Sequence, residues 1–285
     1  MAEQDGDYSV LHVETKRGAY MRVYFDAASE QIARARAPCL GMQLNLLQAE
    51  LGDTRNNAQW NAVVFTSDAK YAPPRGVDHQ TRWVMRTDVI DAEVANIETM
   101  LLAVIPHEQV HEFQTRIGVG LPRWFSEGHA TWAAIRIYNS LRPGLAAEKR
   151  DERIAKLEQS VTPVDLSRWT SVRPKREAIM RQVSPEDRAR MEQDPDYSPT
   201  GSFTFTMDDF EDDESNMEAR YGAAMLVFEG LEKRHGAAAV RDWAKAVTAS
   251  ANRVDEVRMA QSVREHFGED LDVLLSEPNK EAFAR

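Results

Sequence analysis

Two histidines and a glutamate stand at a spacing that could bind a metal ion and activate water. His107 and His111 are four positions apart in the segment HEQVH, and Glu108 follows the first of them. On a helix, residues four apart project from one face, so both imidazoles can reach a single ion. Glu108 is rotated by about 100° and can contact a water on that ion without binding the metal. Three fixed positions in five residues also arise by chance, so this motif is not decisive alone.

A third potential ligand comes sixteen residues after His111. Glu127 lies in the segment LPRWFSEGHATW, and Gly118, Gly120 and Pro122 precede it in a connector that is long enough to reverse the chain. A second helix could then lie beside the first, and Glu127 could approach the same ion. Two histidines and one glutamate are a known ligand set of catalytic zinc sites, which keep a fourth position open.

The segments HEQVH and WFSEGHATW together resemble the catalytic core of the gluzincin zinc metallopeptidases. These include thermolysin-like, aminopeptidase-type and wider peptidase MA-like proteins. The resemblance implies that His107, His111 and Glu127 bind one zinc ion and that Glu108 is the general base. Segments 221–228 and 266–271 resemble the same proteins in outline only.

Tyr221 is the candidate donor to the oxyanion, because the resemblance implies a Tyr or His on a later helix. A half-buried aromatic residue on an amphipathic helix is the alternative interpretation. The chain has no segment like the Gly-x-Met-Glu-Asn with which aminopeptidase-type members hold a free N-terminus, and this favours an endopeptidase. Pro106 directly before His107 predicts a kink or a new first turn of the helix.

The fold is predicted as α+β and zincin-like, with a small N-terminal mixed sheet and the active-site helix, followed by a mainly helical C-terminal part. The predicted division is residues 1–118 and residues 119–285, as one catalytic unit with the cleft between them. A hairpin is expected over 8–25, a helix with a weak point at Pro38 over 27–51, strands over 60–65 and 83–86, and helices over 91–118, 124–141, 218–235, 237–251 and 255–267. Residues 151–215 are polar and show no sustained period, and together with residues 83–86 they are expected to line the cleft.

Composition limits the class of protein. A net charge of −11 over 285 residues argues against nucleic-acid binding and is compatible with a cleft that prefers basic or neutral peptides. The chain has no run of eighteen apolar residues, so the sequence predicts no membrane-spanning helix. The acidic start, without a signal peptide, predicts a cytoplasmic protein, or a periplasmic or secreted one if a leader has been removed. Cys39 is the only cysteine, which excludes an intramolecular disulfide and predicts a buried structural thiol.

Three hypotheses for function follow. The favoured one is a zinc metallopeptidase, acting on a peptide or protein substrate. The second is a catalytically silent zinc-binding protein that serves as a binding or regulatory module, and the third is a helical protein in which HEQVH is a coincidence. Other polar residues are expected to have lesser roles: His129 as a structural or cleft residue, Glu112 as a solvated charge or a partner of His111, and residues 208–214 as a flexible acidic loop.

Overall fold

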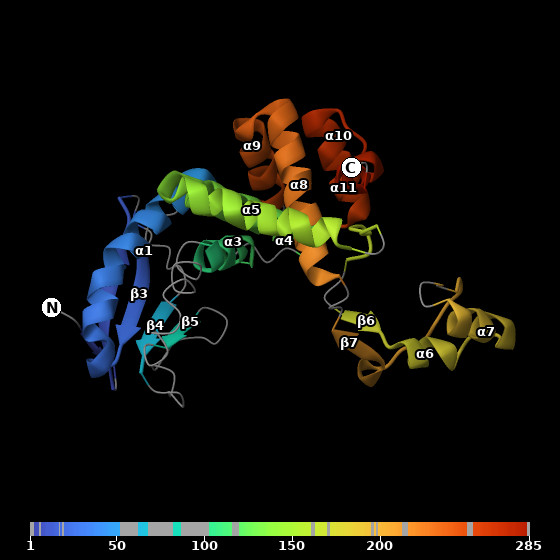
Figure 1. The fold of residues 1–285 in the computed structure, drawn as a ribbon, viewed down its shortest axis with the longest axis horizontal. Coiled ribbons are helices and arrows are strands. Elements are labelled where there is room, and N and C mark those ends of the chain that lie inside the picture. Colours follow the sequence, from blue (N-terminus) through green and yellow to red (C-terminus); the bar gives the residue numbers. More distant parts are fainter. Residues whose placement is uncertain are drawn as a thin grey trace.

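The protein is represented by a computed structural model, which describes residues 3–5, 7–16, 18, 20–51, 62–67, 82–86, 103–115, 120–160, 163–169, 172–194, 197, 199–212, 216–249 and 253–283. A sheet lies at one end, a body of helices lies beside it, and residues 172–212 form an arm that projects away from the helices (Figure 1). The predicted α+β class, a small N-terminal mixed sheet followed by a mainly helical part, is confirmed. Within the described residues, no helix has the length and apolar character needed to cross a membrane.

Among the residues that the structure describes, five strands form the N-terminal sheet, in the order β1 (Glu3–Asp5), β2 (Tyr8–Glu14), β3 (Tyr20–Phe25), β4 (Ala62–Thr66) and β5 (Arg82–Arg86). The first three pair antiparallel, whereas β4 runs parallel to both of its neighbours. All five residues of β4 are buried, as expected for a strand covered on both faces. The predicted hairpin is confirmed by the pairing of β2 with β3, and the two later predicted strands correspond to β4 and β5.

Helix α1 (Glu30–Leu51) packs against β2 and β3. It is entered through a 3-10 turn, η1 (Ala27–Ser29), whose N-cap Asp26 accepts a hydrogen bond from the backbone N–H of Ser29. Leucines at helical spacing face the core and are fully buried: Leu40, Leu44 and Leu47. The predicted weak point at Pro38 does not end the helix, and Cys39 is half-buried, not buried as predicted.

In the described part of the chain, four helices lie around the candidate site: α3 (Ile105–Thr115), α4 (Arg123–Leu141), α5 (Pro143–Glu158) and α8 (Met217–His235). Helix α4 packs on the other three. It crosses α8 closely at Gly128, where an added Cβ would lie 2.7 Å from the carbonyl oxygen of Ala224. Helix α3 falls within the predicted helix over 91–118, and residues 91–102 and 116–118 of that range lie outside the described residues.

Helix α5 was missed, because the sequence predicted a stop at residues 142–144 and no regular structure after 151. The chain leaves the helical conformation only at Arg142, with φ of −144° and ψ of 76°. Pro143 then opens the next helix, at a position where the missing N–H has no cost. Its fully buried residues are Ala146 and Leu157, too few to produce a visible apolar period.

The C-terminal helices are α9 (Ala237–Thr248), α10 (Glu256–Phe267) and α11 (Leu271–Phe283), of which α11 was not predicted. Gly236 joins α8 to α9 with a φ of 84°, a conformation that favours glycine. Trp243 of α9 is fully buried and contacts two other core rings, Phe125 at 5.1 Å and Phe228 at 5.6 Å between centroids. This aromatic cluster fixes the C-terminal helices to α4 and α8.

The arm begins and ends as a two-stranded antiparallel ribbon of β6 (Val172–Pro174) and β7 (Phe210–Asp212). Between the strands lie α6 (Arg176–Met180), α7 (Pro185–Gln193) and a 3-10 turn, η5 (Met207–Asp209). The prediction of a flexible acidic loop over 208–214 is wrong for residues 208–212, which lie in η5 and β7. Asp209 is held there by an ion pair with Arg181 and by hydrogen bonds from Thr206.

Candidate metal centre

Helix α3 places two imidazoles on one face. His107 and His111 are one turn apart, and their Nε2 atoms lie 3.1 Å from each other. Pro106 is the second residue of α3, and residues 103–104 directly before this helix have π-helical conformation. The predicted new first turn is not confirmed, because helical conformation is present before this proline; the winding changes from π- to α-helical at this point.

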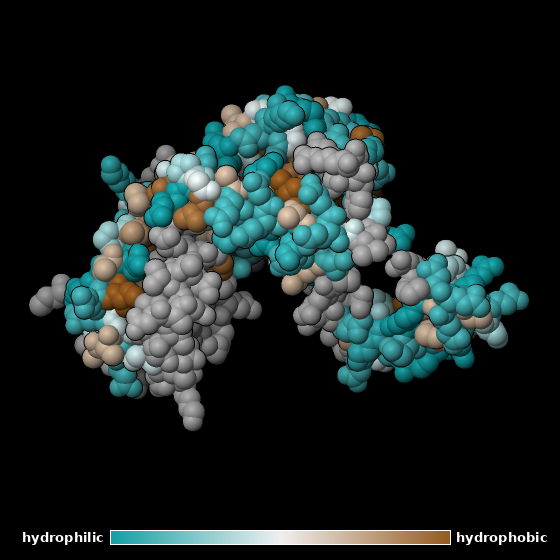
Figure 2. All heavy atoms as spheres, viewed as in Figure 1, coloured by the Kyte–Doolittle hydropathy of each residue, from teal (hydrophilic) through white to brown (hydrophobic). Residues whose placement is uncertain are grey.

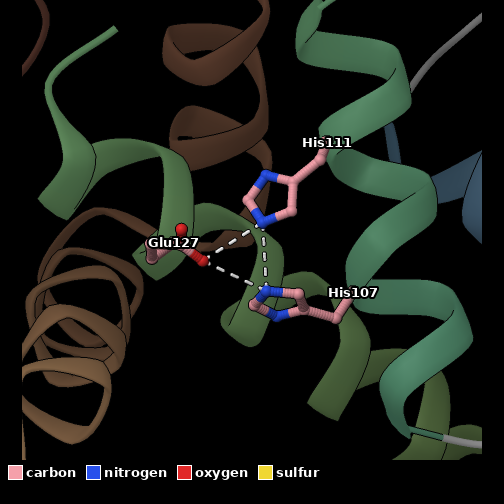
Figure 3. A group of neighbouring side chains, drawn as sticks. All are labelled: His107, His111 and Glu127. Carbon is pink, nitrogen blue, oxygen red and sulfur yellow. Dashed lines mark hydrogen bonds and ion pairs between the residues drawn. The ribbon is translucent and has the colours of Figure 1, made fainter. Parts of the chain in front are cut away.

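Helix α4 brings Glu127 to the same point. The helix starts directly after Pro122, whose carbonyl accepts the backbone N–H groups of Phe125 and Ser126 at 3.1 and 3.0 Å. In the next turn, Oε2 of Glu127 lies 3.2 Å from Nε2 of His107 and 3.1 Å from Nε2 of His111. Figure 3 shows the three side chains pointing toward one another from two facing helices.

The separations fit a tetrahedral metal ion. Ligand atoms about 2.0–2.1 Å from a tetrahedral zinc ion lie about 3.3 Å from one another. The three atoms of His107, His111 and Glu127 are 3.1–3.2 Å apart, close to that value. The side chains are 15%, 22% and 15% exposed, so the point at which they meet is shielded but can be reached from solvent. Two imidazoles and one carboxylate are thus a donor set that fits zinc and leaves one position open.

Burial and mutual contacts set the charges of these side chains. Burial lowers the pKa of His107, which keeps this imidazole neutral. Burial acts in the same direction on His111, but hydrogen bonding to Glu127 outweighs it and raises the pKa of His111. Burial opposes ionisation of Glu127, yet its contacts with the two imidazoles outweigh burial and hold its pKa far below the usual range. A neutral imidazole and an ionised carboxylate are the forms that bind a metal.

Gln114 orients His111 from behind. Its Oε1 lies 2.9 Å from Nδ1 of His111 and accepts the hydroxyl of Ser126 at 2.6 Å, while its Nε2 donates to the carbonyl of Ser126 at 3.1 Å. An amide oxygen only accepts, so Nδ1 of His111 carries a proton, and in the neutral imidazole Nε2 then presents its lone pair to the cluster. Glu112 was the residue considered for this task from the sequence, but Gln114 occupies the place behind the ring. Gln114 lies three residues after His111, on the same helical face, and this spacing could have identified it from the sequence.

His107 has its own neighbour behind the ring. Oγ1 of Thr131 lies 3.3 Å from Nδ1 of His107, and Thr131 is one turn beyond Glu127 on α4. Both helices that carry the cluster therefore also carry groups that contact the outer nitrogens of its imidazoles. Carboxylates, carbonyls and waters usually fill this role in metal sites, and an amide and a hydroxyl fill it here.

His129 is a core residue, one of the two roles predicted for it. It is 2% exposed and stacks on the rings of Phe228 and Trp132, at 5.7 and 6.2 Å between centroids. Burial, and to a smaller extent the charge of His111, lowers the pKa of His129 to about 3. The side chain is therefore neutral at physiological pH and packs away from the cluster.

Tyr221 reaches the cluster from α8. Its ring lies 6.0 Å from that of His107 and makes an edge-to-face contact with Trp169 at 5.2 Å between centroids. Burial, and next the negative charge of Glu127, raises the pKa of Tyr221 to about 12. The phenol consequently keeps its proton and remains a hydrogen-bond donor.

A cavity of about 550 Å³ opens beside the cluster. His107, Glu108 and Tyr221 line it, together with residues of α4 and α5. It can hold several residues of an extended peptide. The expectation that part of 151–215 borders the cleft is met by residues 152–156 of α5, whereas the side chains of 83–86 lie outside the described part of the chain.

No family model and no curated protein matches the chain. Among solved structures, native leukotriene A4 hydrolase from Saccharomyces cerevisiae is similar, with a TM-score of 0.53 and 12% identity over 98% of this chain and 39% of that chain. The chain shares the fold of that part of the enzyme. The yeast hydrolase in complex with bestatin gives a TM-score of 0.52 at 11% identity, over 97% of this chain and 39% of that chain. An M1 zinc metallopeptidase from Deinococcus radiodurans shows a weaker likeness, with a TM-score of 0.49 at 14% identity over 98% of this chain and 49% of that chain.

Proposed function

We propose that this protein is a zinc-dependent metallopeptidase, in which His107, His111 and Glu127 hold one zinc ion and Glu108 is the general base. The observation that carries the proposal is the convergence of two imidazole nitrogens and one carboxylate oxygen, 3.1–3.2 Å apart, beside a cavity that Glu108 also lines. The fold shared with a hydrolase supports hydrolytic chemistry.

The chain's own residues have distinct tasks in peptide hydrolysis. A zinc ion in the site would lower the pKa of a coordinated water toward neutrality and polarise the substrate carbonyl. Glu108 takes the proton of the attacking water and passes it to the leaving amine. Tyr221, protonated because its pKa is raised to about 12, donates a hydrogen bond to the carbonyl oxygen as that oxygen gains charge.

An endopeptidase is the form of activity that we propose. The chain has no segment like the Gly-x-Met-Glu-Asn that holds a free N-terminus in aminopeptidase-type proteins.

Metal analysis combined with peptide cleavage tests the proposal, with wild type compared to Glu108→Gln. We expect one zinc per chain in both proteins, and a loss of about 10²–10⁴-fold in kcat/KM for the variant. Glu108 is not a ligand, so unchanged zinc content separates loss of the base from loss of the metal. Zinc binding without cleavage of any peptide would favour the catalytically silent binding module, and absence of zinc binding would overturn both hypotheses.

A further inference from the structure

One wall of the cavity carries a row of cations. Lys149, Arg153 and Lys156 stand on α5 at positions i, i+4 and i+7, which lie on one face of a helix. All three line the cavity that also contains His107 and Glu108. We call these three residues the α5 cation stripe. Figure 2 shows that the surface over this part of the molecule is mostly hydrophilic.

The stripe is only partly neutralised. Lys149 pairs with Glu152 at 2.9 Å, and Arg153 pairs with Glu218 of α8. Lys156 has no ion pair with any residue in the described part of the chain. The wall therefore offers the ammonium group of Lys156 to an anion that enters the cavity. The partners of the other two cations, Glu152 and Glu218, are 53–55% exposed and line the same cavity, so the anion competes with them for Lys149 and Arg153.

The stripe lies within reach of a peptide bound at the cluster. The guanidinium of Arg153 is 5.1 Å from the centre of the Tyr221 ring, and that ring is 6.0 Å from the ring of His107. These contacts place Arg153 close enough for about three extended residues to span the interval. The remaining lining is mixed. Six of its residues are apolar, whereas Glu108, Glu152 and Glu218 are acidic, so an anion is favoured only where it lies closer to the stripe than to these carboxylates.

We propose that the α5 cation stripe binds a carboxylate of the substrate, supplied by an acidic side chain or by the C-terminus, within about three residues of the scissile bond. This inference rests on the proposed peptidase function. It reverses the expectation drawn from the net charge of −11. Charges farther away than about 8 Å are screened at physiological ionic strength, so the local wall decides what the cavity attracts.

Four peptides with one common core sequence test the inference. The first is neutral and amidated, the second carries a glutamate and is amidated, the third is neutral with a free C-terminal carboxylate, and the fourth carries a lysine and is amidated. For wild type we expect kcat/KM to be roughly three- to tenfold higher for the second or third peptide than for the first. Which of the two is favoured identifies the source of the carboxylate. The preference should shrink as salt is added.

Variants of Lys156 test whether the preference for carboxylate-bearing peptides comes from the α5 cation stripe. Lys156 is exposed and on the helix surface, so its replacement should not disturb folding. In Lys156→Gln the ratio between carboxylate and neutral peptides should fall toward one, and in Lys156→Glu the lysine peptide should become the favoured one. Lys245→Gln is the matched control, because Lys245 is an exposed residue of α9 and is not among the cavity residues. It should keep both the rate and the ratio of wild type.

Binding to zinc-loaded Glu108→Gln, measured by fluorescence anisotropy with the same peptides, separates the two proposals. A preference for carboxylate peptides in binding, without hydrolysis by wild type, would uphold the stripe and overturn the peptidase. Cleavage of all four peptides at equal kcat/KM would overturn the stripe and leave the peptidase in place. A preference that survives in Lys156→Glu would also overturn it.

Discussion

At the scale of single residues, the cluster depends on groups that are not themselves candidate ligands. Gln114 is 3% exposed and holds the Nδ1 proton of His111 through its side-chain oxygen. Its amide group is held in turn by Ser126, from the helix that carries Glu127. One buried side chain therefore links the orientation of a histidine to the position of the neighbouring helix.

Replacing Gln114 should weaken zinc binding without removing a ligand. In Gln114→Leu we expect the zinc dissociation constant to rise about 10–100-fold, because Nδ1 of His111 loses its acceptor. Gln114→Glu keeps an acceptor oxygen and should restore most of the affinity, which a purely structural role would not predict. Competition with a chromogenic chelator measures both, and Gln261→Leu on the exposed face of α10 is the control. Equal affinities in wild type and Gln114→Leu would contradict this positioning role.

The role proposed for Tyr221 in the chemical step can be tested separately from metal binding. Tyr221→Phe keeps the ring that contacts Trp169 but removes the hydroxyl. We expect kcat to fall about 10²-fold, as for removal of one oxyanion donor, with zinc content unchanged. Steady-state kinetics with a cleaved peptide provides the measurement. Unchanged kcat/KM would remove Tyr221 from the mechanism and leave it as a packing residue.

At the scale of helices, the site depends on how closely α4 and α8 approach. Gly128 directly follows Glu127, and a Cβ there would lie 2.7 Å from a backbone oxygen and 2.9 Å from the ring of Phe228. Neither α8 backbone nor a buried ring can move away freely. The glycine in the segment WFSEGHATW is thus explained by helix packing beside the candidate ligand.

Gly128→Ala should therefore destabilise the protein. We expect a loss of about 1–3 kcal/mol in the free energy of unfolding, measured by urea denaturation. Gly144→Ala is the matched control, since Gly144 lies in α5 with no atom within 4 Å of its added Cβ. That variant should gain about 0.5–1 kcal/mol from helix propensity. Destabilisation by both substitutions to the same extent would argue against the packing explanation.

The junction between β4 and α1 should give a stability that depends on pH. Burial opposes ionisation of Asp26, but hydrogen bonds from Ser29 and Ser67 outweigh it and lower the pKa of this carboxyl. A carboxylate with a depressed pKa stabilises the fold above its unfolded pKa of about 4, and this contribution is lost as the pH falls through the folded value. Asp26→Asn should consequently lower Tm at pH 7, and the difference from wild type should shrink below about pH 4. Thermal denaturation over this pH range measures it, and a difference independent of pH would contradict the role of the charge.

At the scale of the whole molecule, the arm of residues 172–212 projects from the body of helices (Figure 1). It leaves and returns through one ribbon, in which Val172 pairs with Asp212, and it carries its own buried residues Ala178 and Met191 (Figure 1). The division of the chain at residues 118 and 119 and a cytoplasmic location stay predictions.

Removal of the arm should leave the metal centre intact. Replacing residues 173–211 by a short glycine-containing turn would join two positions that the ribbon already holds side by side. We expect one zinc per chain, as in wild type, because the three candidate ligands and the described groups behind their imidazoles all lie on α3 and α4. Metal analysis and circular dichroism provide the test. Loss of zinc binding in a protein that keeps its helical spectrum would show that the arm supports the site.

The sequence by itself determined the local features of this protein. Residue spacing along a helix is a property of the chain alone, so the pattern of residues was enough to place His107, Glu108 and His111 on one helix and Glu127 on the next. Strands β2 to β5 and most of the helices followed from the pattern of apolar and β-branched residues, whereas β1, β6 and β7 were not predicted.

Only the tertiary structure decided what meets across elements. Gln114, Thr131 and the α5 cation stripe were missed, because their roles arise from contacts between helices that are distant in sequence. Helix α5 itself was not predicted from the sequence, because it buries few residues and packs mainly against α4 and α8. Apolar periodicity along a helix shows which of its faces is buried. It does not show which residues of other helices the polar and charged side chains will contact.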